Sequence, residues 1–329
     1  MNTATLLATA ALLISSVTAQ AQAPKVDLKS IKGTVRVDGS STVFPIMEAV
    51  AEEFAKAAPH IKVPVGVSGT GGGFKRFCSG ETAISTASRP ITPSEVTLAE
   101  SNKIEFIELP IAFDALSIVV SPKNDWVKSI TIEQLKKIYS AGAATKWNEI
   151  DPTWPDRAMK VFSPGTDSGT FDYFKEAVLG KDGKMRADMS VSEDDNVLVI
   201  GVGGDRDAIG FFGLAYFEEN TDKLRAIPII GADKAPVAPQ ASTVNDGTYP
   251  LSRPLFIYVN AKNAHAPEVV ALVDFVLAKV NAIVDEVGYI ELPTAVMATT
   301  AANWKSRKTG TAFVKDGKKV DGAFTTLYR

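Results

Sequence analysis

The sequence predicts an α/β protein folded in two lobes, and three observations support this. Short apolar strands alternate with amphipathic helices from Gly33 onward, which is typical of an α/β protein. The 329 residues are enough for roughly two domains of about 150 residues each. No fixed short repeat and no low-complexity tract interrupts the alternation. We expect the chain to cross between the lobes more than once, so that its middle forms one lobe and both ends the other.

In the first part of the chain we expect a strand over 34–37 and a helix whose apolar face starts at Val43 and ends at Phe54. A strand over 61–67 leads into a glycine-rich loop, after which a helix begins near Gly72. Another helix follows Thr92-Pro93-Ser94. Segments 104–110 and 115–121 are predicted as two separate strands, because Pro110 and Asp114 stand between them.

The second part repeats this alternation. We expect a helix over 131–140, a strand over 159–163 and a further helix after the loop that begins at Ser163. The charged segment 181–196 is interpreted as loop or a short exposed helix. Segments 207–217 and 224–230 are strand candidates, and a strong strand signal lies around Pro250 and Pro254. A long helix is predicted over 267–286, ahead of "GYIELP".

The N-terminus and the overall charge limit the functional class. Residues 1–21 are uncharged and largely apolar and end in Ala19-Gln20-Ala21, which predicts a secretory signal peptide. The alternative, a single membrane anchor, is disfavoured because the apolar run is short. No cysteine follows it for lipid attachment, and Cys78 alone can form no intramolecular disulfide, so we expect a periplasmic protein rather than a lipoprotein. A net charge of −3 argues against nucleic-acid binding.

Hydroxyl and glycine residues cluster at three predicted helix starts: "GSST" (39–42), "SGTGGG" (68–73) and "TDSGT" (166–170). Each helix start exposes unpaired N–H groups with a partial positive charge, and Ser and Thr add neutral donors. One such motif alone is more often a plain helix cap, whereas three aimed at one point would form an oxyanion site. The second is not a nucleotide-binding P-loop, because Gly73 is followed by Phe74-Lys75-Arg76.

A fourth motif, "STASRPI" (85–91), places Ser88 and Arg89 after a short strand. A guanidinium beside a hydroxyl can bind a tetrahedral oxyanion through two hydrogen bonds and offset part of the cost of burying it. Without the three loops, a surface arginine would be the preferred interpretation.

Four stretches carry a resemblance to a known family: "VDGSSTVFPIMEAVAEEF", "VGVSGTGGGFKRFCSGETAISTASRPI", "FSPGTDSGTFDYF" and "AIGFFGLAYF". They resemble the periplasmic phosphate-binding proteins that feed the high-affinity phosphate ABC transporter, in the same order and spacing. The resemblance implies a two-lobed type II periplasmic binding protein with its ligand cleft between the lobes. It divides the chain into 33–119 and 253–329 for the first lobe and 120–252 for the second.

The resemblance also implies the binding residues and partners. The ligand is inorganic phosphate, no cofactor or metal is expected, and the partner is a membrane permease served by a monomeric receptor. The phosphate-binding residues expected from the resemblance are Thr42, Val43 (mainly backbone), Thr70, Ser88, Arg89, Ser168, Gly169 and Thr170. Ser41 is a neighbouring candidate.

Two positions depart from the best-known form of the family. Ser88 stands where that form has an aspartate that accepts the proton of hydrogen phosphate, and Pro164 stands where it has an arginine. Our hypothesis is that Arg89 supplies the displaced cation. The missing aspartate leaves selectivity over sulfate open, with Asp167, a Ser88 lone pair or a backbone carbonyl as alternative acceptors.

Other chemistries have weaker support in the sequence. A hydrolase needs a base for its nucleophile, and His60 and His265 lie in no motif that would orient them. The acidic run at 192–196 lacks the glycine and terminal glutamate of a calcium loop. The main alternative is therefore a receptor for another tetrahedral oxyanion, such as sulfate, in the same fold, and a secreted phosphohydrolase comes well behind it.

Overall fold

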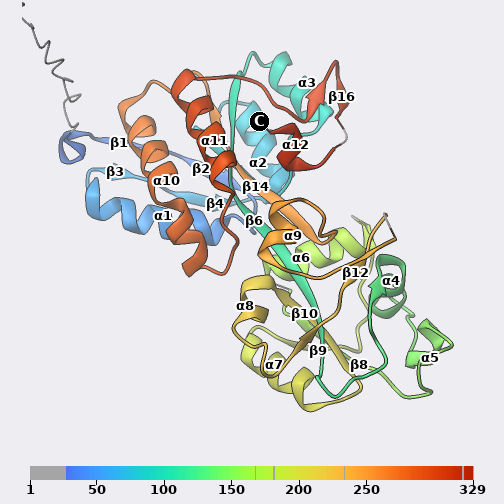
Figure 1. Ribbon diagram of the computed structural model, residues 1–329. Helices are drawn as coiled ribbons and strands as arrows, with labels where there is room; N and C mark the ends of the chain where they lie inside the picture. The colour runs from blue at the N-terminus through green and yellow to red at the C-terminus, as the bar shows by residue number, and fades with distance from the viewer. Residues whose placement is uncertain (1–26, 167, 181, 233, 321, 329) are drawn as a thin grey trace, which may run out of the picture.

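The computed structural model describes residues 27–166, 168–180, 182–232, 234–320 and 322–328. It confirms the α/β class and the two lobes (Figure 1). One lobe contains both ends of the described chain and the other its middle. The predicted signal peptide, 1–21, lies outside the described residues. In the part of the chain that is described, no helix is long and apolar enough to span a membrane.

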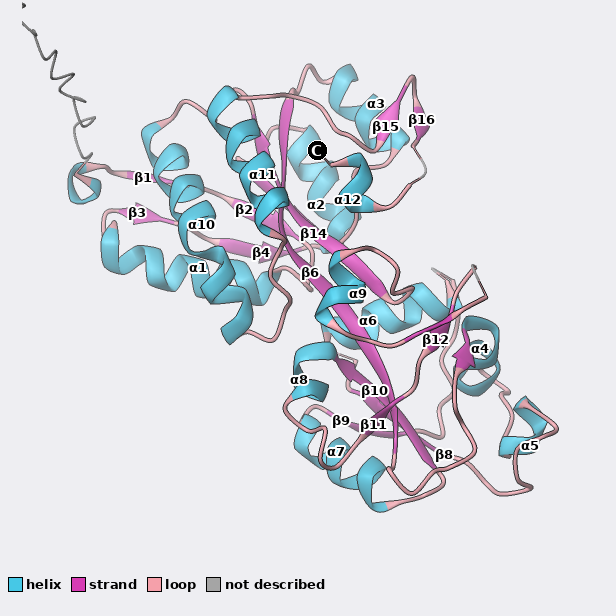
Figure 2. Cartoon of the chain, viewed as in Figure 1, coloured by secondary structure: helices cyan, strands magenta, loops and turns pink. Residues whose placement is uncertain are grey.

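The helices cover both faces of the sheets (Figure 2). They are η1 (Leu28–Ser30, 3-10), α1 (Phe44–Ala57), α2 (Gly69–Cys78), α3 (Pro93–Ser101), α4 (Ile132–Tyr139), α5 (Trp147–Ile150), α6 (Gly169–Phe174), η2 (Lys175–Leu179, a π-helical turn), α7 (Asp195–Gly204), α8 (Leu214–Glu218), α9 (Ala241–Asn245), α10 (Pro267–Glu286), α11 (Thr294–Ser306) and α12 (Phe324–Leu327).

The strands include two long ones and many short ones. They are β1 (Gly33–Thr34), β2 (Val37–Gly39), β3 (Ile61–Lys62), β4 (Val65–Val67), β5 (Ile84–Ala87), β6 (Phe106–Val120), β7 (Ile130–Thr131), β8 (Lys160–Pro164), β9 (Ser190–Ser192), β10 (Ala208–Gly213), β11 (Arg225–Ala226), β12 (Ile229–Ile230), β13 (Pro236–Val237), β14 (Ser252–Asn260), β15 (Val314–Lys315) and β16 (Lys318–Lys319).

One sheet runs through both lobes in the order β4-β2-β5-β14-β6-β10-β8-β9. Strand β6 pairs with β14 in the first lobe and, from Leu116 onward, with β10 in the second, so it belongs to both. The prediction of two separate strands here was wrong. Pro110 is tolerated because a register shift lies beside its partner Phe256, and Asp114 faces Arg253 on β14, which offsets its charge.

Other element boundaries also differ from the prediction. The strands expected over 34–37 and 61–67 are each divided into short pieces, and α2 begins at Gly69 rather than near Gly72. The segment 181–196 contains the edge strand β9. Helix α10 has the predicted bounds, and Thr131, the first residue of the predicted helix over 131–140, caps α4. Helix α3 begins at Pro93 with Thr92 as its N-cap, rather than after Ser94.

The core positions the helix starts at the cleft between the lobes. In the first lobe, α1 and α10 bury Val50, Phe54 and Leu272 in one hydrophobic cluster. In the second lobe Phe174 of α6 stacks on Phe211 of β10, with ring centroids 3.9 Å apart. This contact fixes α6 against the sheet that continues from the first lobe.

The C-terminal segment is held by a buried carboxylate on β6. Glu108 is 3% exposed and accepts hydrogen bonds from the hydroxyls of Thr311 (2.5 Å) and Tyr258 (2.9 Å) and from the N–H of Ala312 (3.2 Å). The Tyr258 hydroxyl in turn accepts the N–H of Ile91, close to the predicted site. Burial raises the pKa of Glu108 to about 7, because its hydrogen bonds only partly offset the loss of solvation.

Candidate functional site

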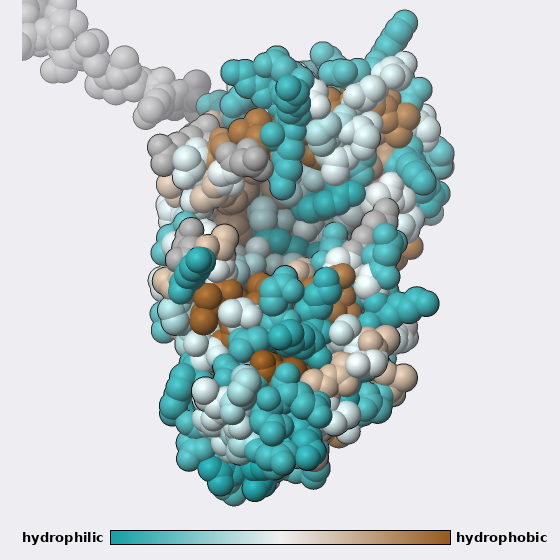
Figure 3. Space-filling model, turned by 90° about the vertical axis from the view of Figure 1, so that its right-hand side faces the viewer, coloured by the Kyte–Doolittle hydropathy of each residue, from teal (hydrophilic) through white to brown (hydrophobic). Residues whose placement is uncertain are grey.

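A polar cavity of about 530 Å³ lies between the lobes, and the surface is hollowed there (Figure 3). It is lined by Ser40, Ser41, Thr42, Gly69, Thr70, Gly71, Ser88, Arg89, Thr92, Asp172, Lys175, Glu176, Gly180 and Arg253. Cavities of 300–1,000 Å³ suit drug-sized molecules, so this one has room to spare around a five-atom anion. The cavity therefore leaves space around an anion of that size.

The first loop precedes α1. Gly39 has φ +148°, and a Cβ there would lie 2.2 Å from the carbonyl oxygen of Thr86, so only glycine fits. Thr42 is 3% exposed, its hydroxyl accepts a hydrogen bond from Arg253 (2.9 Å), and its carbonyl accepts one from Tyr289 (2.6 Å). Val43 is the N-cap of α1, and its side chain is fully buried, so it can offer a ligand only its backbone.

The second loop and the strand β5 bring two hydroxyls together. Gly69 adopts φ +73° at the start of α2, which turns the chain so that Thr70 lines the cavity. The hydroxyls of Thr70 and Ser88 lie 3.1 Å apart, and the Ser88 N–H donates to Thr70 Oγ1 at 3.2 Å. If Ser88 donates both bonds, the Thr70 hydroxyl keeps its own hydrogen for a ligand.

The third loop approaches the first from the other lobe. The Ser168 hydroxyl accepts the Thr170 N–H at 3.2 Å and caps α6, as the capping alternative expects. A Cβ on Gly169 would lie 3.2 Å from Thr42 Cα, so the starts of α1 and α6 are in contact across the cleft. Ser168, Gly169 and Thr170 do not line the cavity in this form of the protein.

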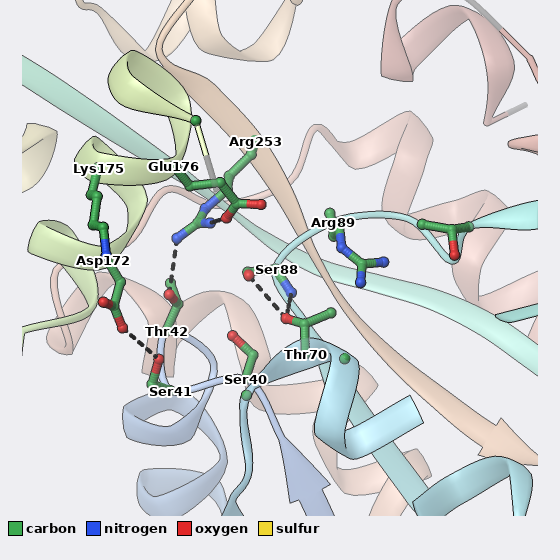
Figure 4. Close-up of a pocket in the computed structure, with 14 residues that line it drawn as sticks. Ser40, Ser41, Thr42, Thr70, Ser88, Arg89, Asp172, Lys175, Glu176 and Arg253 are labelled. Carbon is green, nitrogen blue, oxygen red and sulfur yellow. Dashed lines mark hydrogen bonds and ion pairs between the residues drawn. The ribbon is translucent and has the colours of Figure 1, made fainter. Parts of the chain in front are cut away.

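Arg89 lies at the cavity wall, but its charge is already paired. Its guanidinium donates to both carboxylate oxygens of Glu95, at 2.8 and 2.9 Å. Burial alone would raise the pKa of Glu95, yet the hydrogen bonds from Arg89 and Thr92 hold it below its ordinary value. Arg89 points away from the space that the hydroxyls surround (Figure 4). It is therefore poorly placed to be the displaced cation of our hypothesis.

Arg253 was not predicted as a site residue, yet it does face that space (Figure 4). Its side chain is 11% exposed; Asp114 Oδ2 lies 3.1 Å from Nε, and the Tyr173 ring lies 3.7 Å from Cζ. Burial raises the pKa of Asp114, and the guanidinium opposes that rise. One signal was available, because Ser252-Arg253-Pro254 repeats the tripeptide of Ser88-Arg89-Pro90.

The second lobe adds three charged residues to the cavity: Asp172, Lys175 and Glu176. The Ser41 hydroxyl lies 3.5 Å from Asp172 Oδ2, a contact at the limit of a hydrogen bond that spans the cleft. Asp167, proposed above as a proton acceptor, lies outside the described residues.

The groups considered for catalysis lie elsewhere. Neither His60 nor His265 lines the cavity. Cys78 is buried, which raises its pKa to about 11 and keeps its thiol protonated at neutral pH. Among the described residues, no group of three His, Cys, Asp or Glu side chains is placed to hold a metal ion.

Comparisons with known proteins identify the family to which this fold is similar. A family model described as a PBP superfamily domain matches residues 19–280. The protein SphX of Synechococcus elongatus is 46% identical over 317 residues, which cover 95% of this chain and 93% of that protein. The phosphate-binding protein PstS of Staphylococcus haemolyticus is 38% identical over 266 residues, covering 80% of this chain and 83% of that protein.

Solved structures show the same similarity. One described as a possible phosphate binding protein from Planctomyces limnophilus is 43% identical and superposes with a TM-score of 0.82, covering 85% of this chain and all of that one. An ABC-type phosphate transport receptor from Vibrio cholerae is 26% identical with a TM-score of 0.64, covering 79% of this chain and all of that one.

Proposed function

This chain belongs to the PBP superfamily, and on that premise we propose that it captures inorganic phosphate between its lobes and delivers it to the permease of an ABC transporter. The family is one of solute receptors rather than enzymes. The predicted signal peptide supports a periplasmic location, and a monomer suits a receptor that diffuses between ligand and membrane.

The observation that carries this proposal is the position of Arg253 among neutral hydroxyl donors. Thr42, Thr70, Ser88 and the guanidinium of Arg253 surround one space at the starts of two helices (Figure 4). Hydroxyls and backbone N–H groups bind an oxyanion without adding charge, and the helix starts add their partial positive charge. Asp114 offsets part of the Arg253 charge, and the neutral donors add hydrogen bonds to the anion without adding further charge.

Closure of the lobes would complete the site. The cavity is larger than phosphate needs, and the predicted ligands of the third loop, Ser168 to Thr170, lie just outside it. An anion that contacts both lobes stabilises the closed form, because it gains those extra donors only there. The permease can then recognise the loaded receptor by its shape.

Selectivity depends on an acceptor for the proton of hydrogen phosphate, because fully ionised sulfate has none to offer. Ser88 occupies the position that the family resemblance assigns to the accepting aspartate. It is 7% exposed and its hydroxyl retains a lone pair, so it can accept the phosphate proton without repelling the anion. The second candidate function is a sulfate receptor. No carboxylate stands at the position of Ser88, and a hydroxyl can also donate a hydrogen bond to sulfate, which has no proton of its own.

The test is a calorimetric titration of the processed protein, stripped of bound anion by unfolding and refolding. We expect one phosphate to bind per chain, with a Kd of about 1 μM or lower, and to bind equally well in excess sulfate. The absence of a phosphate signal would refute the proposal, and sulfate that blocks the titration would favour the second candidate.

A further inference from the structure

Glu176 differs from the other partners of Arg253. Its carboxylate lies 3.6 Å from Arg253 Nη1, whereas the hydrogen bonds to Asp114 and Thr42 measure 3.1 and 2.9 Å. The Glu176 side chain is 59% exposed, but that of Asp114 is only 7% exposed. Glu176 is thus the partner that can leave Arg253 for water at the lowest cost.

The position of Glu176 links this contact to the movement of the lobes. Glu176 lies in the π-helical turn η2 of the second lobe, and π-helical turns often occur at functional sites. Arg253 lies on β14, and its partner Thr42 precedes α1 in the first lobe. Opening and closing of the cleft therefore changes the distance between Glu176 and the space where the anion is proposed to bind.

The negative charges around Arg253 disfavour the presence of both Glu176 and phosphate beside it. Asp114 already contributes one negative charge at 3.1 Å, and a bound hydrogen phosphate would add up to two more. If Glu176 stayed at 3.6 Å, its carboxylate would repel the anion through a partly desolvated cleft. The two must compete for the Nη1 edge of Arg253.

We propose that Glu176 is a tethered competitor of the bound anion, which occupies Arg253 in the open form and speeds the release of phosphate when the lobes part. This inference rests on the proposed function. When phosphate leaves, Glu176 again supplies a negative charge 3.6 Å from Arg253 Nη1, as in the present structure. Glu176 therefore lowers the affinity and raises the release rate, and it is a positioning residue rather than a ligand.

The opposite role for Glu176 would be to accept the proton of hydrogen phosphate. A carboxylate in that role strengthens phosphate binding and excludes sulfate. The two roles predict opposite effects of removing the charge, so one substitution separates them.

The experiment compares Glu176→Gln with the unaltered protein by calorimetry and by stopped-flow release of phosphate. We expect a Kd about three- to tenfold lower in the variant, mainly through slower release, and a smaller difference in 1 M NaCl because the contact is exposed. Glu176→Ala should shift the Kd in the same direction. The control is Glu133→Gln on α4, an exposed carboxylate outside the cavity, which should leave Kd unchanged.

Two results would overturn the inference about Glu176. Neither would affect the proposed function, provided that the unaltered protein binds phosphate. Unchanged affinity in both Glu176 variants would show that the carboxylate does not compete. Weaker phosphate binding, together with a lower phosphate-to-sulfate preference, would make Glu176 the proton acceptor instead. If the unaltered protein binds no phosphate, the proposed function itself fails.

Discussion

Replacing Arg253 by methionine removes the cation that faces the cavity and keeps much of the volume of the side chain. The guanidinium can give a phosphate two charge-assisted hydrogen bonds, each worth about 1.5–3 kcal/mol. We therefore expect phosphate binding to weaken by about 3–6 kcal/mol, or about 10²–10⁴-fold in Kd. Calorimetric titration measures this loss directly.

The substitution also leaves Asp114 buried without its partner, which can destabilise the fold by about 3–5 kcal/mol. The double variant Arg253→Met/Asp114→Asn removes the unpaired charge and should recover stability, measured by urea unfolding, without recovering phosphate affinity. Arg206→Met is a matched control, because Arg206 also pairs with a carboxylate, Asp125, and lies 5.0 Å from the ring centroid of Trp126, but outside the cavity. Equal losses of affinity in the Arg253 and Arg206 variants would refute the reasoning.

Three further predictions follow from the same contacts. Thr70→Val keeps the shape but removes a hydroxyl that lines the cavity, so Kd measured by calorimetry should rise about ten- to hundredfold. Arg89→Met should weaken binding by fivefold at most in the same assay, because Glu95 holds that guanidinium through two hydrogen bonds and it points away from the space that the hydroxyls surround. Burial raises the pKa of Glu108 from 4.5 to about 7, so its stabilising effect is complete below about pH 4.5 and is lost as the pH rises through about 7. Glu108→Gln should remove that slope, up to about 3 kcal/mol in the free energy of unfolding measured by urea denaturation from pH 4 to 8.

Each of these predictions has a result that contradicts it. Unchanged affinity in Thr70→Val would remove that hydroxyl from the site. A loss in Arg89→Met as large as in Arg253→Met would restore Arg89 as the principal cation. An identical pH slope in Glu108→Gln and in the unaltered protein would mean that the carboxyl titrates alike in the folded and unfolded chains.

Local sequence patterns predicted the features that depend on local chemistry. The cap of α4 and the full length of α10 follow from helix-start signals and apolar spacing. Thr42, Thr70 and Ser88 were found because hydroxyl and glycine clusters mark the helix starts and the strand end that carry them.

Features that depend on pairing between distant segments could not be predicted in this way. Arg253 reaches the site through a hydrogen bond to Thr42, 211 positions away in the sequence, because β14 pairs with β6 where the chain returns to the first lobe. The same pairing makes β6 continuous: Asp114, which argues against a strand when considered alone, is neutralised by Arg253 on the neighbouring strand. The pairing of Arg89 with Glu95, which also forms the capping box of α3, was not predicted either.

The most direct test of the central claim is a crystal structure of the processed protein grown with phosphate. We predict one tetrahedral anion within hydrogen-bond distance of Thr42, Thr70, Ser88 and Arg253, with the Ser168–Thr170 loop drawn onto it. An anion bound away from Arg253, or a cleft that stays empty at saturating phosphate, would contradict the account.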